Sequence, residues 1–156
     1  MRRYGLFTEL QVKVLIGRSR GLTLRELAKI IGSSHQNIGV AERRAYENLE
    51  IARKTITVYN LITSPVKIVV DRGTHLMDIP RIIVDECDSR GIKLRADFTL
   101  IYKLIRFYTP DCICGSYVVK PILIVVDPHG FPYIYPLDKI EDLYMVLMEI
   151  EETLFG

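Results

Sequence analysis

Long apolar runs are missing from this sequence of 156 residues. The longest, such as Ile122–Val126, are far shorter than the roughly 20 residues that a membrane-spanning helix needs. The N-terminal residues Met1–Tyr4 include two arginines and begin no apolar signal segment. We therefore expect no membrane contact and a location in the cytoplasm.

Cysteine is scarce as well, because the chain holds only Cys87, Cys112 and Cys114. Three is an odd number and too few for a disulfide framework, so we expect reduced thiols. A zinc site built from these cysteines and His129 would need Cys-x-x-Cys pairs, whereas the sequence offers Cys-x-Cys and no second pair. We therefore expect no metal site.

The motifs of catalysis are also absent. No Ser-His-Asp or Cys-His arrangement, glycine-rich phosphate loop or carboxylate pair stands in a context that chemistry would need. The three histidines, His35, His75 and His129, lie in unrelated settings. We therefore expect a protein that is not an enzyme and that holds no cofactor.

Charge is present but unevenly distributed. Residues 1–57 hold 11 Lys and Arg against 5 Glu, a net charge of +6, and residues 58–156 hold 10 Lys and Arg against 14 Asp and Glu, a net charge of −4. A basic first third on a slightly acidic remainder is typical of a polyanion-binding head on a body with another role. A basic surface that is merely solvated is the alternative.

Helix-start signals follow one another in this first third. The segments Thr8–Gln11 and Thr23–Glu26 both carry the capping-box pattern, in which a threonine cap is followed three residues later by Gln or Glu. We expect the first helix to run to about Arg20, and the second to be a short helix that ends at Gly32.

A third helix should start from a cap at Ser34, with Ile38, Ala41 and Ala45 on its inner face. A fourth helix is expected from about residue 49 to residue 60. The segment Thr63–Pro65 should break it, and we place a domain boundary there, between residues 1–63 and 64–156. The outer face of the third helix carries His35, Gln36, Asn37, Gly39, Val40, Arg43 and Arg44.

Beyond the boundary, strands and helices alternate. The predicted elements are a strand over 66–70, a helix over 78–90, a helix over 97–107, a strand over 121–127, an edge strand over 131–135, and a final helix capped by Asp138. The fold class is therefore α+β, with an N-terminal helix-turn-helix domain followed by a small α/β domain that we expect to have a mixed sheet.

The polar face of the third helix fits the reading helix of a helix-turn-helix, which lies in the major groove of DNA. The side-chain amides of Gln36 and Asn37 can each donate and accept, and so match N6 and N7 of adenine, while His35 could contact a base edge or a phosphate. The glycine at Gly39 would allow close approach, and Val40 could touch a thymine methyl group.

The remaining polar residues suit contacts to the DNA backbone, which position a protein without reading sequence. Arg25 and Lys29 belong to the second helix, Ser34 to the turn, and Arg43 and Arg44 to the third helix one turn beyond the reading positions. An ordinary helical subdomain with a solvated polar face is the alternative reading of the same pattern.

The segment Thr23–Ser34 with Ile38 and Leu49 resembles the promoter-reading helix-turn-helix of bacterial sigma factors. A closer likeness is to the archaeal Tfx family of transcription regulators, and it extends from the start of the chain to about Asn60. It rests on Phe7–Gln11, Gly21–Thr23, Asn37, Glu42–Ala45 and Ala52–Thr55. The resemblance implies a DNA-binding head joined to a C-terminal α/β domain, acting on a promoter.

The role of the second domain is less constrained. We expect it to form a homodimer or to sense a small-molecule effector, with double-stranded DNA as the partner of the head. Asp71, Arg72, Gly73 and Thr74 follow one strand and Asp127 follows another, so they could line a ligand crevice, a plain solvated loop being the alternative. Two other functions stay open: an adaptor of the transcription machinery, and a nucleotide-handling α/β enzyme with an added helical domain.

Overall fold

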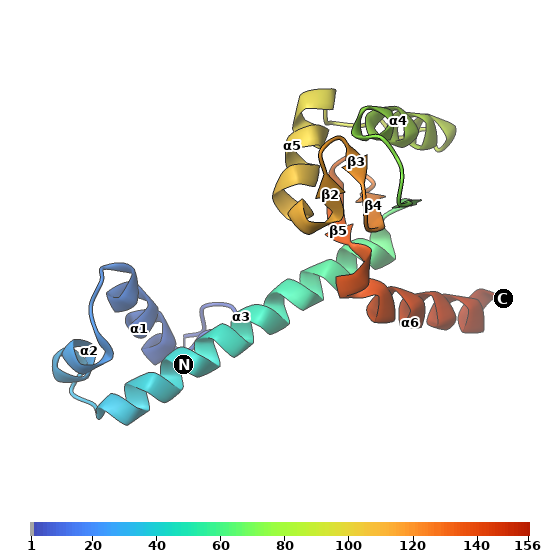
Figure 1. Cartoon of the computed structure of the whole chain (residues 1–156). Coiled ribbons are helices and arrows are strands. Elements are labelled where there is room, and N and C mark those ends of the chain that lie inside the picture. Colours follow the sequence, from blue (N-terminus) through green and yellow to red (C-terminus); the bar gives the residue numbers. More distant parts are fainter. Residues whose placement is uncertain (1) are drawn as a thin grey trace. The chain divides into compact units, whose positions relative to one another are not determined.

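The computed structural model describes residues 2–156 and forms two compact units, divided between Thr57 and Val58. Unit 1 contains α1 (Glu9–Ser19), α2 (Leu24–Ile31) and the first part of α3 (His35–Thr63), and unit 2 contains the rest of the chain (Figure 1). No helix among the described residues combines the length and the hydropathy that crossing a membrane requires. That the head is separable at Thr63–Pro65 stays a prediction.

The N-terminal caps of α1 and α2 are confirmed. Both capping boxes are complete, with Thr8 and Thr23 each accepting a backbone N–H three residues on while Gln11 and Glu26 accept the backbone N–H of the cap. The small core of unit 1 consists of Val14, Leu27, Ala28, Ile38 and Ala41. Its helices are thus set by local caps and closed by a few apolar contacts.

The separate fourth helix is wrong, because α3 continues for 29 residues without a break. No glycine or proline lies between Val40 and Ser64, so nothing in the backbone chemistry ends the helix earlier. What looked like two helices is one helix whose buried face changes along its length.

Unit 2 is built on two small sheets with helices. Its elements are β1 (Val66–Val70), the 3-10 turn η1 (Leu76–Asp78), α4 (Ile79–Ser89), α5 (Phe98–Tyr108), the 3-10 turn η2 (Pro110–Cys112), β2 (Ile113–Cys114), β3 (Tyr117–Val118), β4 (Ile122–Val126), β5 (Pro132–Pro136) and α6 (Leu137–Phe155). The short hairpin of β2 and β3 was not predicted, because strands of two residues carry no readable alternation.

The main sheet has the order β1-β4-β5, and both of its strand pairs are antiparallel. The expectation of a mixed sheet was therefore wrong. After the helices and the β2–β3 hairpin, the chain enters β4 running antiparallel to β1, so the sheet contains no parallel strand pair. Every side chain of the central strand β4 is buried, as a strand covered on both faces requires. The strand β5 lies at the edge, where Pro132 was predicted to place it.

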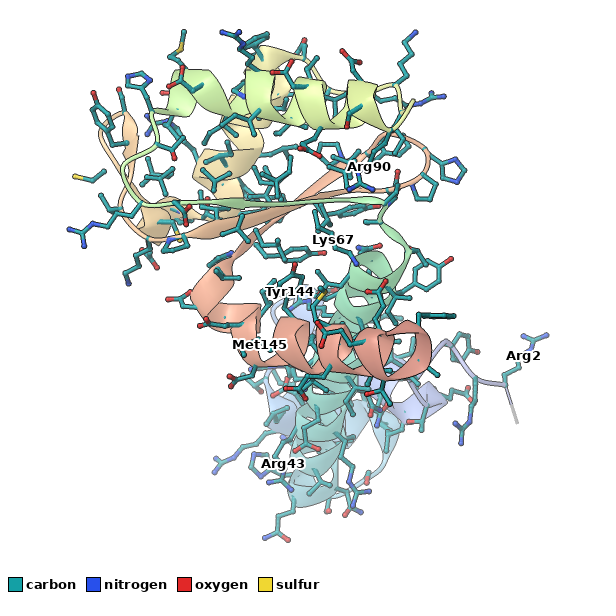
Figure 2. All side chains as sticks on the ribbon, turned by 90° about the vertical axis from the view of Figure 1, so that its right-hand side faces the viewer. Arg2, Arg43, Lys67, Arg90, Tyr144 and Met145 are labelled. Atoms are coloured by element: carbon teal, nitrogen blue, oxygen red, sulfur yellow. The ribbon has the colours of Figure 1, made fainter. Side chains whose placement is uncertain are left out.

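Helices cover the two faces of this sheet separately. On one face the alternate residues Val66, Ile68 and Val70 of β1 join the large core that α4 and α5 cover. On the other face Leu123 and Val125 pack with Leu61 and with the inner residues of α6. In Figure 2 α4 and α6 lie on opposite sides of the sheet.

Two helix starts differ from their predictions. Asp78 makes no side-chain cap; instead the Nδ1 atom of His75 accepts the backbone N–H of Met77 at 3.1 Å and begins η1, from which α4 continues. The final helix α6 begins at Leu137 directly after Pro136, so Asp138 lies in its first turn and does not cap it. A proline at the end of β5 fixes the backbone just before that helix.

Candidate nucleic-acid interface

The turn between α2 and α3 has the tight geometry of a helix-turn-helix. Gly32 adopts φ 78° and ψ 36°, a left-handed conformation that favours glycine, and both its N–H and that of Ser33 donate to the carbonyl oxygen of Ala28. Two residues later the Oγ atom of Ser34 accepts the backbone N–H of Asn37 at 3.1 Å. The Ser34 cap fixes the register of α3 that the sequence predicted.

The first three turns of α3 have one face in the core and one in solvent. Ile38, Ala41 and Ala45 are buried, as predicted. At 100° per residue, Gln36 and Arg43 lie on the side of the helix opposite to Ala45, and both are exposed. The outermost row of α3 thus carries an amide and a guanidinium group about two turns apart.

Asn37 lies on a flank of α3 and differs from Gln36 in its contacts. Its Nδ2 atom donates to the Oγ atom of Ser33 at 3.4 Å, so part of its amide already has a partner inside unit 1. Val40 is half-buried on the same flank. Together with Arg44 these residues line a shallow hollow against the start of α1, formed by Thr8, Leu10, Gln11, Ser33, Asn37, Val40, Ala41 and Arg44.

Gly39 lies on the other flank, next to α2. A Cβ atom added there would lie 3.9 Å from Leu24 Cδ1, an ordinary van der Waals distance. The packing of unit 1 therefore does not require glycine at this position. His35, in the first turn, is exposed.

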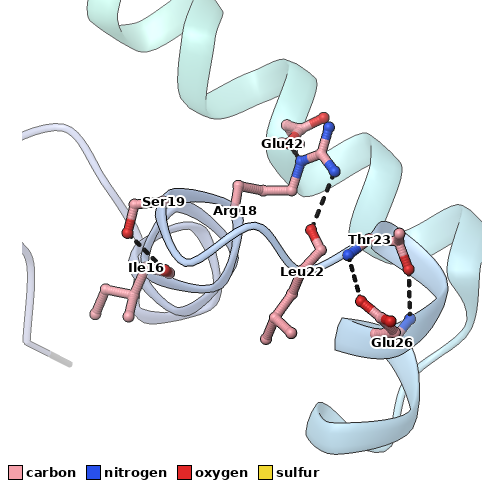
Figure 3. A network of polar contacts seen from close by, with 7 residues as sticks. All are labelled: Ile16, Arg18, Ser19, Leu22, Thr23, Glu26 and Glu42. Carbon is pink, nitrogen blue, oxygen red and sulfur yellow. Dashed lines mark hydrogen bonds and ion pairs between the residues drawn. The ribbon is translucent and has the colours of Figure 1, made fainter.

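The basic residues of unit 1 fall into two groups. Arg18 Nε donates to Glu42 Oε2 at 2.7 Å and its Nη1 atom donates to the carbonyl oxygen of Leu22 at 3.1 Å, so this arginine ties α1 to α3 (Figure 3). Arg53 is likewise paired, with Glu50 at 2.9 Å. Lys13 also pairs with Glu9, at 3.7 Å within α1, and among these pairs only Arg18–Glu42 joins two helices.

The second group consists of exposed cations without internal partners. This group includes Arg25, Lys29, Arg43 and Arg44, and in residues 2–156 no carboxylate lies within 4.0 Å of their cationic groups. Arg43 and Arg44 project from α3, and Arg43 is labelled in Figure 2. Arg2 and Arg3 at the start of the chain are also exposed. They were not among the predicted contacts, although the charge count of the first third includes them.

The tail that carries Arg2 and Arg3 is attached to the helices. Tyr4 and Phe7 exchange backbone hydrogen bonds of 3.2 and 3.1 Å around Gly5, and the Nδ2 atom of Asn48 donates to the carbonyl oxygen of Leu6 at 3.1 Å. These bonds hold the beginning of the chain against α3. The exposed positive charges of unit 1 therefore include its N-terminal residues.

The candidate ligand-binding residues of unit 2 lie at two opposite ends of the sheet. Val70 pairs with Ile122 and Val66 pairs with Val126, so the loop of Asp71, Arg72, Gly73 and Thr74 lies at the end opposite to Asp127. Gly73 donates its N–H to Val118, and the carbonyl oxygen of Thr74 accepts the N–H of Val118, which ties the loop to β3. The structure does not bring this set together.

Asp127 has a local role in the turn between β4 and β5. One carboxylate oxygen, Oδ1, accepts the backbone N–H groups of His129 and Phe131, both at 2.9 Å. Gly130 completes this turn with φ 89°, and an added Cβ there would collide with the carbonyl oxygen of Lys93. The carboxylate is therefore used in shaping the predicted turn.

The cysteines do not gather. Cys87 and Cys112 are buried in unit 2 and Cys114 is exposed. Burial raises the pKa of the Cys87 thiol, with a further contribution from the Asp88 carboxylate, and burial likewise raises the pKa of the Cys112 thiol. Among residues 2–156 no three His, Cys, Asp or Glu side chains are grouped so that they could hold a metal ion.

Comparison with known proteins gives a consistent set of relatives. A protein from Methanococcus vannielii, provisionally named a transcriptional regulatory protein, is 34% identical over 132 residues, which are 85% of this chain and 93% of the relative. A similarly named protein from Methanocaldococcus jannaschii is 37% identical over 123 residues, 79% of this chain and 90% of the relative. The DNA-binding protein Tfx of Methanothermobacter marburgensis is 33% identical over 106 residues, 68% of this chain and 77% of the relative.

A family match extends this likeness beyond the helical head. The family described as "DNA_binding protein, TFX, C-term" matches residues 52–134, which is more than half of the chain and includes most of unit 2. The resemblance drawn from the helical first part of the chain is confirmed, and it continues through the sheet that this part could not reveal. The chain belongs to the Tfx family.

Proposed function

We propose that this protein is a sequence-specific DNA-binding regulator of transcription, in which the Ser34 cap and residues 35–45 of α3 enter the major groove. The observation that carries the proposal is the exposed face of α3, where Gln36 and Arg43 stand opposite the buried residues. The relative from Methanothermobacter marburgensis is named a DNA-binding protein, which supports the same function here. Regulation of transcription is also in keeping with the names of the other relatives.

The exposed side chains divide into reading and anchoring groups. Gln36 is the best placed to read a base, because its amide lies on the outermost row and the structure gives it no internal partner among the described residues. Asn37 would have to give up its bond to Ser33 before it could hold an adenine with two bonds. We therefore infer that Gln36 contributes more to base preference than Asn37.

The anchoring group consists of cations whose charge is not used inside unit 1. Each phosphate that such a cation neutralises releases counterions, so affinity for any duplex falls as salt rises. Arg43 and Arg44 of α3, with Arg25 and Lys29 of α2, would place the head on the DNA backbone without reading sequence. Arg18, which is paired with Glu42, should not contribute to this salt-dependent affinity.

Alanine variants of the full chain test the two roles separately. Gln36→Ala, and to a smaller extent Asn37→Ala, should relax discrimination at particular base pairs by about 1 to 3 kcal/mol. Arg43→Ala or Arg44→Ala should weaken every duplex alike and reduce the salt slope by about one unit without changing the ranking of sequences. The measurement is selection of bound duplexes from random DNA, followed by titrations at several salt concentrations.

A matched control removes a cation far from α3 in sequence. Arg81, an exposed residue of α4, should leave both affinity and salt slope unchanged when replaced by alanine. Base preference that survives alanine at Gln36 and Asn37 but follows His35 or Val40 would mean that α3 faces the groove in another register. If none of these four positions matters, α3 is not the reading helix and the proposal fails.

For unit 2 we propose the pairing of two chains, since a two-fold dimer presents two reading helices to two half-sites. The exposed apolar side chains of α6 support this role. A small-molecule effector stays a prediction, for which a ligand-induced rise in the melting temperature is the test.

A further inference from the structure

The last two turns of α6 continue an apolar stripe beyond the core that the helix covers. Its earlier inner residues, among them Leu143 and Leu147, pack on Leu123 and Val125 of β4. Farther along the helix, Ile150, Leu154 and Phe155 are 51%, 68% and 86% exposed. The chain therefore presents to solvent the side chains that would extend this packing.

The end of α3 forms the other wall of a groove along this stripe. Leu61 and Ile62 face the C-terminal half of α6 across a space of about 410 Å³, and Ile62 is itself 60% exposed. The groove is lined by Leu61, Ile62, Lys67, Tyr144, Leu147, Met148, Ile150, Glu151, Leu154 and Phe155. It belongs entirely to unit 2.

The exposed apolar area is the size that a second protein surface would cover. Ile62, Met148, Ile150, Leu154 and Phe155 together expose roughly 500 Å², taking about 150 to 200 Å² for each whole side chain. One side of a standard interface buries about 800 Å², of which somewhat more than half is apolar. The patch therefore supplies about the apolar share of one such side.

The two charged residues of the groove have opposite signs. Lys67 lies in β1 on the face that α6 covers, since its neighbours Val66 and Ile68 face the other core (Figure 2). Glu151 lies near the exposed end of α6. Within residues 2–156 neither makes an ion pair of 4.0 Å or less.

A surface that carries both an apolar stripe and two unpaired opposite charges is complementary to itself. In a two-fold interface the contact of residue i with residue j is matched by the contact of j with i. Lys67 of one copy can therefore meet Glu151 of the other twice in the same dimer. We propose that two copies of the chain pair through this groove, with the end of α6 of each copy against the groove of the other and with Lys67 and Glu151 paired across the interface.

This inference deepens the dimerisation part of the proposed function and uses unit 2 alone. It is tested in the absence of DNA, by the oligomeric state. A dimer that binds no duplex would leave it intact and overturn the DNA-binding proposal, while a monomer that reads sequence through Gln36 would do the reverse. The two failures are therefore distinguishable.

The experiment reverses each charge in the full chain. In Lys67→Glu, every homodimer would bring together two pairs of carboxylates, and in Glu151→Lys two pairs of ammonium groups, so each variant alone should dimerise about tenfold more weakly or worse. In the heterodimer of the two variants, one chain carries carboxylates at positions 67 and 151 and the other chain carries ammonium groups there. Both contacts between the chains therefore join opposite charges. Heterodimers should therefore form more tightly than either variant pairs with itself, measured by sedimentation equilibrium at micromolar concentrations in low salt.

Recovery in the mixture separates a contact between chains from a contact inside each chain, because mixing cannot restore opposite charges within one chain, and charge exchange within one chain then tests the pairing itself. The double variant Lys67→Glu with Glu151→Lys restores opposite charges at both contacts of a homodimer, so it should recover the wild-type affinity. Glu141→Lys, at an exposed position near the start of α6 and outside the groove, is the matched control and should leave dimerisation unchanged. Far-UV circular dichroism checks that every variant is folded.

Three results would overturn the inference. A wild-type chain that stays monomeric at tens of micromolar has no such interface. A dimer that neither charge reversal weakens, or whose weakened variants do not recover both in the mixture and in the double variant, does not pair Lys67 with Glu151 between chains. A monomer that binds the apolar probe ANS at the groove, with loss of binding in Leu154→Glu, would assign the groove to a small apolar ligand instead.

Discussion

Two helical glycines of unit 1 have opposite surroundings, and they offer a matched pair of substitutions. Gly17 in α1 is buried; an added Cβ there would collide with Leu27 Cδ2 and would lie 2.9 Å from Leu27 Cγ and 3.0 Å from Leu27 Cδ1. Gly39 in α3 has room, since its added Cβ would meet only Leu24 Cδ1, at 3.9 Å. Both glycines have helical backbone, so neither is required by a left-handed conformation.

The magnitudes follow from these contacts. Alanine is preferred to glycine in a helix interior by about 1 kcal/mol, so Gly39→Ala should raise the free energy of unfolding of unit 1 by about 0.5 to 1 kcal/mol. Gly17→Ala has the same gain, but overpacking costs about 1 to 3 kcal/mol. Because three atoms of the buried Leu27 side chain are too close, we expect the upper part of that range and a net loss of about 1 to 2 kcal/mol.

Hydrogen exchange of the full-length variants measures this difference in the right part of the molecule. Amides of residues 9–45 report the opening of unit 1 without the contribution of unit 2 to a global signal. The two variants should differ by about 1.5 to 3 kcal/mol, with wild type between them. If Gly17→Ala is as protected as wild type, Leu27 moves at little cost and the close approach of α1 to α2 does not depend on glycine.

Gly39→Ala also bears on the interface with DNA. Since the packing of unit 1 accepts alanine there, the reason for a glycine has to be sought outside the unit. If the backbone of α3 approaches DNA closely at this position, the variant should bind duplex DNA more weakly although its fold is more stable. Equal or tighter binding, measured beside the exchange data, would refute that reason.

Two further predictions concern thiols and an ion pair. At pH 8 an alkylating reagent should modify Cys114 rapidly and Cys87 and Cys112 slowly, because the last two are buried and their raised pKa values lower the thiolate fraction. Mass spectrometry of the digested protein measures these rates, and equal rates would contradict the burial. A double-mutant cycle of Arg18→Ala and Glu42→Ala should give a coupling free energy of unfolding of about 0.5 to 1 kcal/mol, which decreases in high salt. A coupling of zero would mean that the 2.7 Å contact does not stabilise unit 1.

The helices of unit 1 could be predicted because their signals are local. A threonine cap and its partner three residues later determine where a helix begins, and Gly32 at a left-handed position determines where α2 ends. In unit 2 a local cap likewise begins α5, where Asp97 accepts the N–H of Leu100. In each case the cause lies within a few residues of the effect.

The pairing of strands could not be predicted in the same way. Alternating or continuous apolar residues show that β1 and β4 are buried, but these strands lie far apart in the chain, with α4, α5 and the β2–β3 hairpin between them. Their relative direction depends on those connections. The antiparallel order also determines that Asp71 and Asp127 lie at opposite ends of the sheet. A ligand crevice inferred from the carboxyl ends of parallel strands therefore depended on a direction that the sequence does not specify.

The number of cations available to DNA could not be predicted from the sequence either. Counting residues gives the first third a net charge of +6, yet the structure assigns Arg18 of α1 to Glu42 of α3, and Arg53 to Glu50. Such pairs add to the formal count but not to the contacts available for phosphates. With Arg25, Lys29, Arg43 and Arg44 as anchors, each head would neutralise about four phosphates and have a salt slope of about −3.6. A head that used all eleven of its basic residues would have a slope more than twice as steep. The internal pairs account for part of that difference, and the rest depends on whether other exposed cations, such as Arg2 and Arg3, also reach phosphates.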